Sequence, residues 1–148
     1  MSQLPKALVF DLDGCIWEPE LYELYGGAPF TVCPNGDLTD KSGEKIYLMG
    51  DVRNILHELK NECKWSNTVV AIASKCTEFK WADECLEKFQ LPGKQSLKSI
   101  FHPDLMEIYW DNKQKHHKAI EEKSGIKLND MIFFDNQLDN CHDVRLTS

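Results

Sequence analysis

The sequence predicts an α/β fold in which a parallel sheet lies between two layers of helices, as a three-layer sandwich. Apolar runs occupy residues 7–10 and 131–134, and a third follows Thr68 in a predicted buried strand at 68–73; such runs are typical of strands buried on both faces of a parallel sheet. Segments with helical apolar spacing alternate with these runs, as in repeated strand–helix–strand units. A chain of 148 residues can bury a substantial core, so we expect residues 1–148 to form a single domain.

A small β flap is expected after the first strand, at about residues 18–48. Gly26-Gly27 and Pro29 interrupt any helix there, and Asn35-Gly36 is a strong signal for a hairpin turn. Residues 46–48 add a further short strand. The segment is too short to form a large cap domain.

The remaining elements follow in order along the chain. Apolar residues recur at helical spacing in residues 51–63, with Asp51 as a possible N-cap. Thr77 is placed to cap the next helix, which Leu91-Pro92-Gly93 ends. Further along, the sequence predicts a short strand at 99–101, a segment at 105–109 that is either extended or a loop, and a helix at 115–123 that stops at Ser124-Gly125.

The composition narrows the possible partners and compartment. The net charge of −7 argues against a nucleic-acid partner, because no basic stripe exists to contact phosphates. No apolar run reaches membrane-spanning length, and Met1–Lys6 is not a signal peptide, so we expect a cytoplasmic protein with no membrane partner. The six cysteines are then expected to be reduced thiols, and the lack of a Cys-x-x-Cys pair weakens any zinc interpretation.

Two carboxylates directly follow the first apolar run. Asp11 and Asp13 are spaced i, i+2 and precede Gly14, so on extended chain their side chains can converge at the carboxyl end of the strand. Ligands of open α/β sheets bind at that edge. Two like charges held together need a cation or a shared proton, which indicates a divalent metal with oxygen ligands. The alternative is that the pair caps a turn or faces solvent.

Other polar residues follow the later strands. Ser74 ends the second apolar run, Asp135 ends the last, and Lys113 lies between the third and fourth predicted strands. Because the carboxyl ends of parallel strands share one edge, we expect these side chains to meet the Asp pair there. Together they are the residue types of phosphate and metal chemistry.

Each of these residues also has an ordinary structural interpretation. Ser74 can be a turn hydroxyl, Lys113 can lie on a solvated helix face, and Asp135 can simply begin a turn. Adjacent helix residues point apart, so His116-His117 predicts one inward-facing histidine rather than a metal pair. The four tryptophans are most simply aromatics of the core or its rim.

Taken in order, these residues resemble the four motifs of the haloacid dehalogenase (HAD) superfamily of phosphatases. The chain resembles the magnesium-dependent phosphatase-1 family still more closely, and over nearly its whole length. That closer resemblance rests on five stretches, which are Leu4-Pro5-Lys6, Phe10–Asp13 with Trp17, the Asn35-Gly36 flap, Glu107-Ile108-Tyr109 and Phe133-Phe134-Asp135.

The resemblance implies a mechanism as well as a fold. Asp11 would be the nucleophile that forms an aspartyl-phosphate, and Asp13 would act as general acid and then general base. Mg²⁺ would be bound by the carboxylates of Asp11 and Asp135 and the backbone carbonyl of Asp13. Ser74 and Lys113 would bind the phosphoryl group.

The sequence departs from the family pattern at several positions. Lys75 replaces the arginine after the second-motif serine, so this substrate-binding position loses a bidentate fork. Gly14 and Cys15 follow the Asp pair, where the family places a polar or aromatic residue and then Thr. Asn136 replaces the second acid of the fourth motif, which predicts weaker Mg²⁺ binding, and Asp139 is spaced to supply the missing charge from the outer shell of the metal.

A flap of this size leaves an active site open. Open sites in this superfamily accept macromolecular phosphates, so the resemblance suggests phosphotyrosine in protein or a sugar phosphate as substrate. The main alternative is a catalytically weak HAD-fold protein that binds a partner for a regulatory purpose. A receiver domain would need an acid after the strand at 99–101, and a cysteine phosphatase would need Arg six places after Cys; the sequence has neither.

The family continues beyond the fourth motif into a fifth core strand. This sequence stops at Ser148, before that strand would be complete, so residues 131–134 are expected at the edge of the sheet. An apolar edge strand presents unpaired backbone groups, which predicts self-association through this edge.

Overall fold

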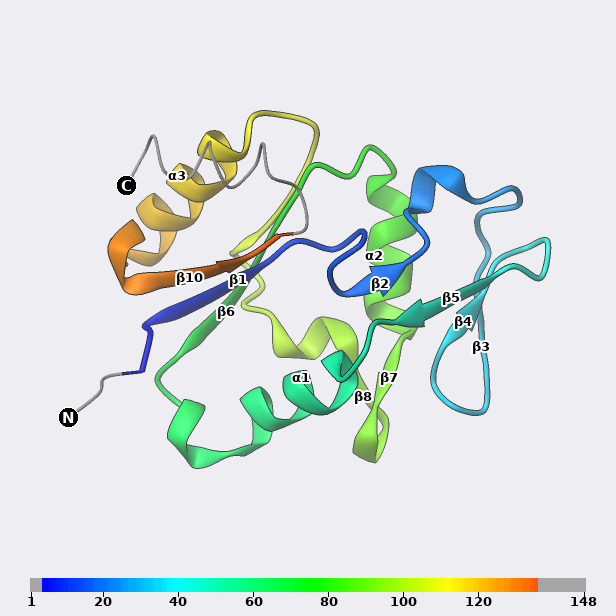
Figure 1. The fold of residues 1–148 in the computed structure, drawn as a ribbon, viewed down its shortest axis with the longest axis horizontal. Coiled ribbons are helices and arrows are strands. Elements are labelled where there is room, and N and C mark those ends of the chain that lie inside the picture. Colours follow the sequence, from blue (N-terminus) through cyan, green and yellow to red (C-terminus); the bar gives the residue numbers. More distant parts are fainter. Residues whose placement is uncertain (1–3, 136–148) are drawn as a thin grey trace.

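A four-stranded parallel sheet forms the centre of the fold (Figure 1). The computed structural model describes residues 4–135. The order across the sheet is β10-β1-β6-β9, and all neighbouring strands are parallel, so the predicted α/β class is confirmed. The strands are β1 (Ala7–Phe10), β6 (Val69–Ser74), β9 (Met106–Ile108) and β10 (Met131–Phe134).

Within residues 4–135, three α-helices lie at the predicted places, with shifted starts for two of them. The second helix begins after Glu78 rather than after Thr77. The third begins earlier than expected, because the Asn112 side chain accepts a hydrogen bond from the backbone N–H of Gln114 at 2.7 Å and caps it there. It ends at Gly125, whose φ of 74° suits glycine. The helices are α1 (Val52–Asn61), α2 (Phe79–Lys88) and α3 (Lys113–Ser124).

Alternate residues of β1 enter two different cores. Ala7 and Val9 belong to a smaller core that includes Ile120 of α3. Leu8 and Phe10 belong to a larger core that includes residues of α1, α2 and the flap. Helices therefore cover both faces of the sheet, with α3 on one side and α1 on the other (Figure 1), which is the three-layer arrangement that the sequence predicts.

The flap is a separate antiparallel sheet with the strand order β2-β5-β4-β3. Asn35-Gly36 lies in the turn between β3 and β4, and Gly36 has a φ of 90° that favours glycine. No large cap domain is present among the described residues. The flap strands are β2 (Trp17–Glu18), β3 (Thr31–Val32), β4 (Leu38–Thr39) and β5 (Lys45–Leu48).

One buried carboxylate organises the turns of the flap. Asp40 is 4% exposed and accepts five hydrogen bonds of 2.7–3.0 Å. Four come from backbone N–H groups and one from the Ser42 hydroxyl. Burial raises its pKa, but these donors outweigh burial and lower the pKa to about 2. The donors are Gly26, Gly27, Ser42 and Glu44.

The predicted strand at 99–101 is wrong. Residues Leu97–Ile100 form a 3-10 helix, η4, which the Ser96 side chain caps by accepting from the N–H of Ser99 at 3.2 Å. Such local side-chain bonds compete with sheet pairing. The fourth sheet position belongs to β9 instead, so the segment at 105–109 is extended rather than a loop. The other short elements are η1 (Leu21–Glu23), η2 (Cys63–Trp65), η3 (Pro92–Lys94), η5 (Leu128–Asp130), β7 (Gln90–Leu91) and β8 (Gln95–Ser96).

β10 is an outer strand of the described sheet, with Ile132 and Phe134 exposed. Self-association through this edge stays a prediction, and the expected missing strand falls outside residues 4–135. The five cysteines within that range are all free thiols. Over the same range, no helix is long and apolar enough to span a membrane.

Candidate active site

The sheet register brings the acids of the first and fourth motifs to the same edge. Phe10 pairs with Phe134 of β10 and with Ile72 of β6, so Asp11 and Asp135 follow neighbouring strands at the same level. The backbone N–H of Asp11 continues the ladder by donating to the carbonyl of Phe134 at 3.0 Å. The predicted convergence of strand ends is therefore observed for these two residues.

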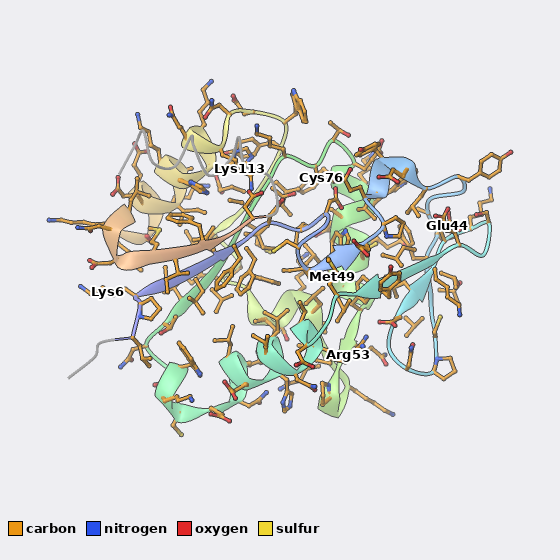
Figure 2. All side chains as sticks on the ribbon, in the orientation of Figure 1. Lys6, Glu44, Met49, Arg53, Cys76 and Lys113 are labelled. Carbon is orange, nitrogen blue, oxygen red and sulfur yellow. The ribbon has the colours of Figure 1, made fainter. Side chains whose placement is uncertain are left out.

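Lys113 joins the two carboxylates. Its side chain is 1% exposed, and its Nζ lies 3.6 Å from Asp11 Oδ1 and 2.9 Å from Asp135 Oδ2. The ammonium also donates to the carbonyl of Ala73 at the end of β6. Lys113 is the first residue of α3, so the start of the helix directs this cation inward (Figure 2). The solvated-face interpretation of Lys113 is wrong.

One ammonium between two buried carboxylates leaves excess negative charge at this edge. Burial is the largest effect on Asp11 and raises its pKa to about 6. The attraction of Lys113 opposes this rise, and the repulsion of Asp135 adds to it. Oxygen ligands with excess negative charge fit a hard divalent cation such as Mg²⁺. The donors that the resemblance implies for a metal are the carboxylates of Asp11 and Asp135 and the backbone carbonyl of Asp13, and the described residues contain no group of three His, Cys, Asp or Glu side chains that could hold a metal ion.

Asp13 lies beside the flap rather than beside Lys113. Its Oδ1 accepts hydrogen bonds from the indole Nε1 of Trp17 at 2.6 Å and from the N–H of Leu21 at 3.3 Å. The thiol of Cys76 also contacts this carboxyl. Burial raises the pKa of Asp13, while these donors oppose the rise. Asp11 and Asp13 therefore have different partners although they are two residues apart.

Ser74 ends β6 as predicted and is 1% exposed. Its hydroxyl oxygen accepts from the N–H of Cys76 at 3.3 Å, which directs the O–H proton away from that amide. Lys75 has a different environment, because its ammonium lies 6.0 Å from the ring centre of Trp110, which is 73% exposed. Lys75, directly after the buried Ser74, thus pairs with Trp110 near the surface.

Cys15 stands where the family has threonine, and its side chain still connects the loop after β1 to a neighbouring strand. Its Sγ donates to the carbonyl of Phe134 at 3.5 Å and so connects the loop after β1 to the end of β10. Burial and the nearby charges of Asp11 and Asp135 raise its pKa to about 11. The thiol is therefore protonated at neutral pH and is a poor nucleophile.

Both adjacent histidines are buried, so the expectation of one inward-facing histidine is wrong. His116 Nε2 lies 3.0 Å from the carbonyl of Ser74 and 2.8 Å from that of Tyr109. The His117 ring packs against Phe133 of β10 at 4.2 Å. His116 therefore faces the chain at the ends of β6 and β9, and His117 faces β10. Both histidines are buried although they point apart on the helix, because strands lie on both sides of the first turn of α3.

A shallow hollow of about 440 Å³ lies between the loop after β1 and the flap. It begins at Gly14, next to Asp13, and most of its other residues carry carboxylates. Asn136 and Asp139, the expected outer-shell residues, lie outside the described part of the chain. The lining residues are Gly14, Glu18, Pro19, Glu20, Glu23, Glu44, Lys45 and Tyr47.

Comparison with known proteins shows which family has this arrangement. Residues 3–147 match the model of the Acid Phosphatase family. The chain is 33% identical over 147 residues to a HAD-like hydrolase superfamily protein of Schizosaccharomyces pombe, covering 97% of this chain and 83% of that relative. It is 32% identical over 144 residues to human magnesium-dependent phosphatase 1, covering 97% of this chain and 74% of the relative.

A solved structure has the same fold. It is the N-terminal part of a Bacteroides fragilis protein that contains a phosphatase domain complexed with Mg, and it aligns with a TM-score of 0.62 at 18% identity. The match covers 97% of this chain and 34% of that one. With the two relatives and the family model, the resemblance drawn from the motifs is confirmed. This chain belongs to the acid phosphatase family of HAD-like hydrolases.

Proposed function

We propose that this protein is a Mg²⁺-dependent phosphomonoesterase that works through an aspartyl-phosphate on Asp11. The observation that carries the proposal is the buried Lys113 between Asp11 and Asp135. A buried cation beside two acids supports a site for a dianionic phosphoryl group and a metal, because Lys113 offsets part of the negative charge that would repel the phosphate and a metal would offset the rest.

Each residue of the site has its own role in the reaction. An oxygen of Asp11 attacks phosphorus, the bond from phosphorus to the leaving oxygen breaks, and the proton of Asp13 moves to that oxygen. Lys113 and the Ser74 hydroxyl hold the phosphoryl oxygens. Asp13, now ionised, then takes a proton from the water that hydrolyses the aspartyl-phosphate. The carboxylates of Asp11 and Asp135 and the backbone carbonyl of Asp13 would hold Mg²⁺, which would supply positive charge that offsets the repulsion between nucleophile and phosphate.

The raised pKa of Asp11 supports this assignment of the metal. In the protein without metal, a carboxyl with a pKa of about 6 is poorly compensated by its surroundings. A divalent cation would favour the ionised form that the attack on phosphorus needs. Asn136 and Asp139 are proposed to tune this metal through water rather than to bind it directly.

The openness of the site supports phosphotyrosine in protein or a sugar phosphate as substrate. The described residues include no large cap domain, and the flap supplies Tyr47 and most of the other residues that line the hollow beside Gly14. The ammonium of Lys75, the residue after Ser74, lies near the exposed ring of Trp110. An aryl leaving group can stack on such side chains, so we expect aryl phosphates to be hydrolysed faster than alkyl phosphates.

The test is hydrolysis of p-nitrophenyl phosphate with Mg²⁺, with EDTA and in the variant Asp11→Asn. Loss of the nucleophile should reduce kcat by about 10⁴-fold or more, and EDTA should abolish activity reversibly. Asp104→Asn removes an exposed carboxylate and is the matched control, which should retain full activity. Should wild type bind phosphate but turn over no aryl or sugar phosphate, the protein would be a binding module instead.

A further inference from the structure

The flap is bonded directly to the carboxyl of Asp13. The indole Nε1 of Trp17, in β2, lies 2.6 Å from Asp13 Oδ1, and the backbone N–H of Leu21, in η1, lies 3.3 Å from the same atom. Both donors belong to the segment that leads into the flap. Asp11, by contrast, is held by the central sheet and by Lys113.

The indole is fixed on all sides. Trp17 is fully buried, and its ring stacks on Phe89 with centroids 5.7 Å apart and planes inclined by 16°. The chain after β1 turns back on itself, because the N–H of Gly14 donates to the carbonyl of Trp17 at 2.8 Å. These contacts leave the indole N–H one orientation, toward Asp13.

An indole nitrogen can donate a hydrogen bond but cannot accept one, and the same holds for a backbone N–H. A proton on Asp13 Oδ1 would therefore point at two donor hydrogens. When Asp13 is neutral, its proton must sit on Oδ2 instead. When Asp13 is ionised, the two donors stabilise the charge on Oδ1. The Cys76 thiol, which can donate and accept, also contacts this carboxyl.

We propose that Trp17 is a positioning residue for the general acid, because it binds Asp13 Oδ1 and thereby keeps the transferable proton on Oδ2. The flap then has a role in the chemistry in addition to forming the rim of the site. This inference rests on the proposed function. In the first step, the Asp11 oxygen–phosphorus bond forms, the phosphorus–leaving oxygen bond breaks, and the Oδ2 proton passes to the leaving oxygen.

The effect should depend on how much the leaving group needs a proton. General acids contribute about 10²- to 10⁴-fold to such steps, and the benefit is greatest for strongly basic leaving groups. In Trp17→Phe, kcat/KM should fall about tenfold or more for phenyl phosphate and less than about threefold for 2,4-dinitrophenyl phosphate. kcat/KM is the right quantity because it does not include hydrolysis of the aspartyl-phosphate.

Two further proteins separate positioning from packing. Replacement of Trp17 by 3-benzothienylalanine keeps the ring shape and removes only the N–H, so it should reproduce the effect even if Trp17→Phe folds poorly. Phe89→Leu loosens the stacking partner but keeps the indole N–H. It should lower the melting temperature and reduce kcat/KM for both substrates by the same factor.

Asp13→Asn, measured in parallel, distinguishes the possible failures. If Asp13→Asn shows the leaving-group dependence and the Trp17 variants do not, the positioning role of Trp17 is refuted while the proposed function stands. If Asp13→Asn loses activity equally for all leaving groups, Asp13 is not the general acid and the positioning role fails, while the proposed function fails only if wild type with Mg²⁺ hydrolyses neither ester. A second readout needs no turnover: in metal-free protein, the Trp17 indole N–H resonance should lie downfield of the other tryptophans and move upfield in Asp13→Ala. An unmoved resonance would also overturn the inference.

Discussion

Asp11→Asn should abolish activity and yet stabilise the metal-free fold. Folding raises the pKa of Asp11 from 3.8 to about 6, so the folded protein binds this proton more tightly than the unfolded chain does. Above pH 6 the carboxyl is ionised in both states, and its charge disfavours the folded one. The rise corresponds to about 3 kcal/mol at pH 7. The attraction of Lys113 is already contained in this figure, since it lowers the same pKa.

The assay is thermal unfolding of both proteins in EDTA between pH 4 and pH 8. For a chain of this size, about 3 kcal/mol corresponds to a rise of about 6–12 °C in Tm. The advantage of Asp11→Asn should be full above pH 6, shrink as the pH falls through 6, and disappear below pH 3.8, where both states of wild type are largely protonated. Asp104→Asn should show no such difference.

Saturating Mg²⁺ should raise the Tm of wild type more than that of Asp11→Asn, because the metal binds the ionised carboxyl and stabilises the folded state. An Asp11→Asn variant that melts at or below the wild-type temperature at pH 7 to 8 in EDTA would refute the reasoning. It would mean that the contacts of Asp11 with Lys113 and with the N–H of Leu12 outweigh the cost of burying the charge.

Three further outcomes are expected. Asp40→Ala should lower the free energy of unfolding by about 3 kcal/mol in urea, since it leaves buried backbone donors without their acceptor; a change below 1 kcal/mol would contradict the role given to Asp40. His116→Gln should keep most activity because its amide can donate to the carbonyls of Ser74 and Tyr109, which lie near Nε2. His116→Asn is too short to reach them and should lose about tenfold in kcat/KM. Equal losses in the two variants would argue against hydrogen bonding by Nε2 to these carbonyls as the contribution of His116. Asn136→Asp should lower the Mg²⁺ concentration that gives half-maximal activity, and Asp139→Asn should raise it, in a metal titration of the rate.

The site could be predicted from sequence where chemistry depends on backbone register. Asp11 and Asp135 directly follow apolar runs, so a parallel sheet alone places them at one edge. The buried position of Lys113 was harder to predict, because the other lysines near it in the sequence are typical of a solvated helix face. Its burial depends on where α3 begins, which the Asn112 cap decides. The spacing of apolar residues alone does not determine that start.

Trp17 and His116 illustrate what sequence reasoning missed. A tryptophan in an apolar segment predicts a core position, and Trp17 does lie in the core. That its N–H also meets Asp13 follows from the tight turn of residues 12–17, which no periodicity reveals. His116 contacts carbonyls from three different segments, so its role appears only once the helix and both strands are in place. The strand predicted at 99–101 failed because Ser96 and Ser99 bond locally.

The hydrogen bonds of Asp40 close a ring of backbone between Gly26 and Glu44, entirely within the flap. None of these hydrogen bonds comes from the parallel sheet. Exposed side chains of the flap that do not bond to Asp40, such as Tyr25 and Val32, are therefore free to vary, or to be joined by inserted residues, without disturbing the strands that place the nucleophile. Evolution, or a protein engineer, can change what this enzyme recognises by exchanging the outer loops of the flap while the parallel sheet remains the same.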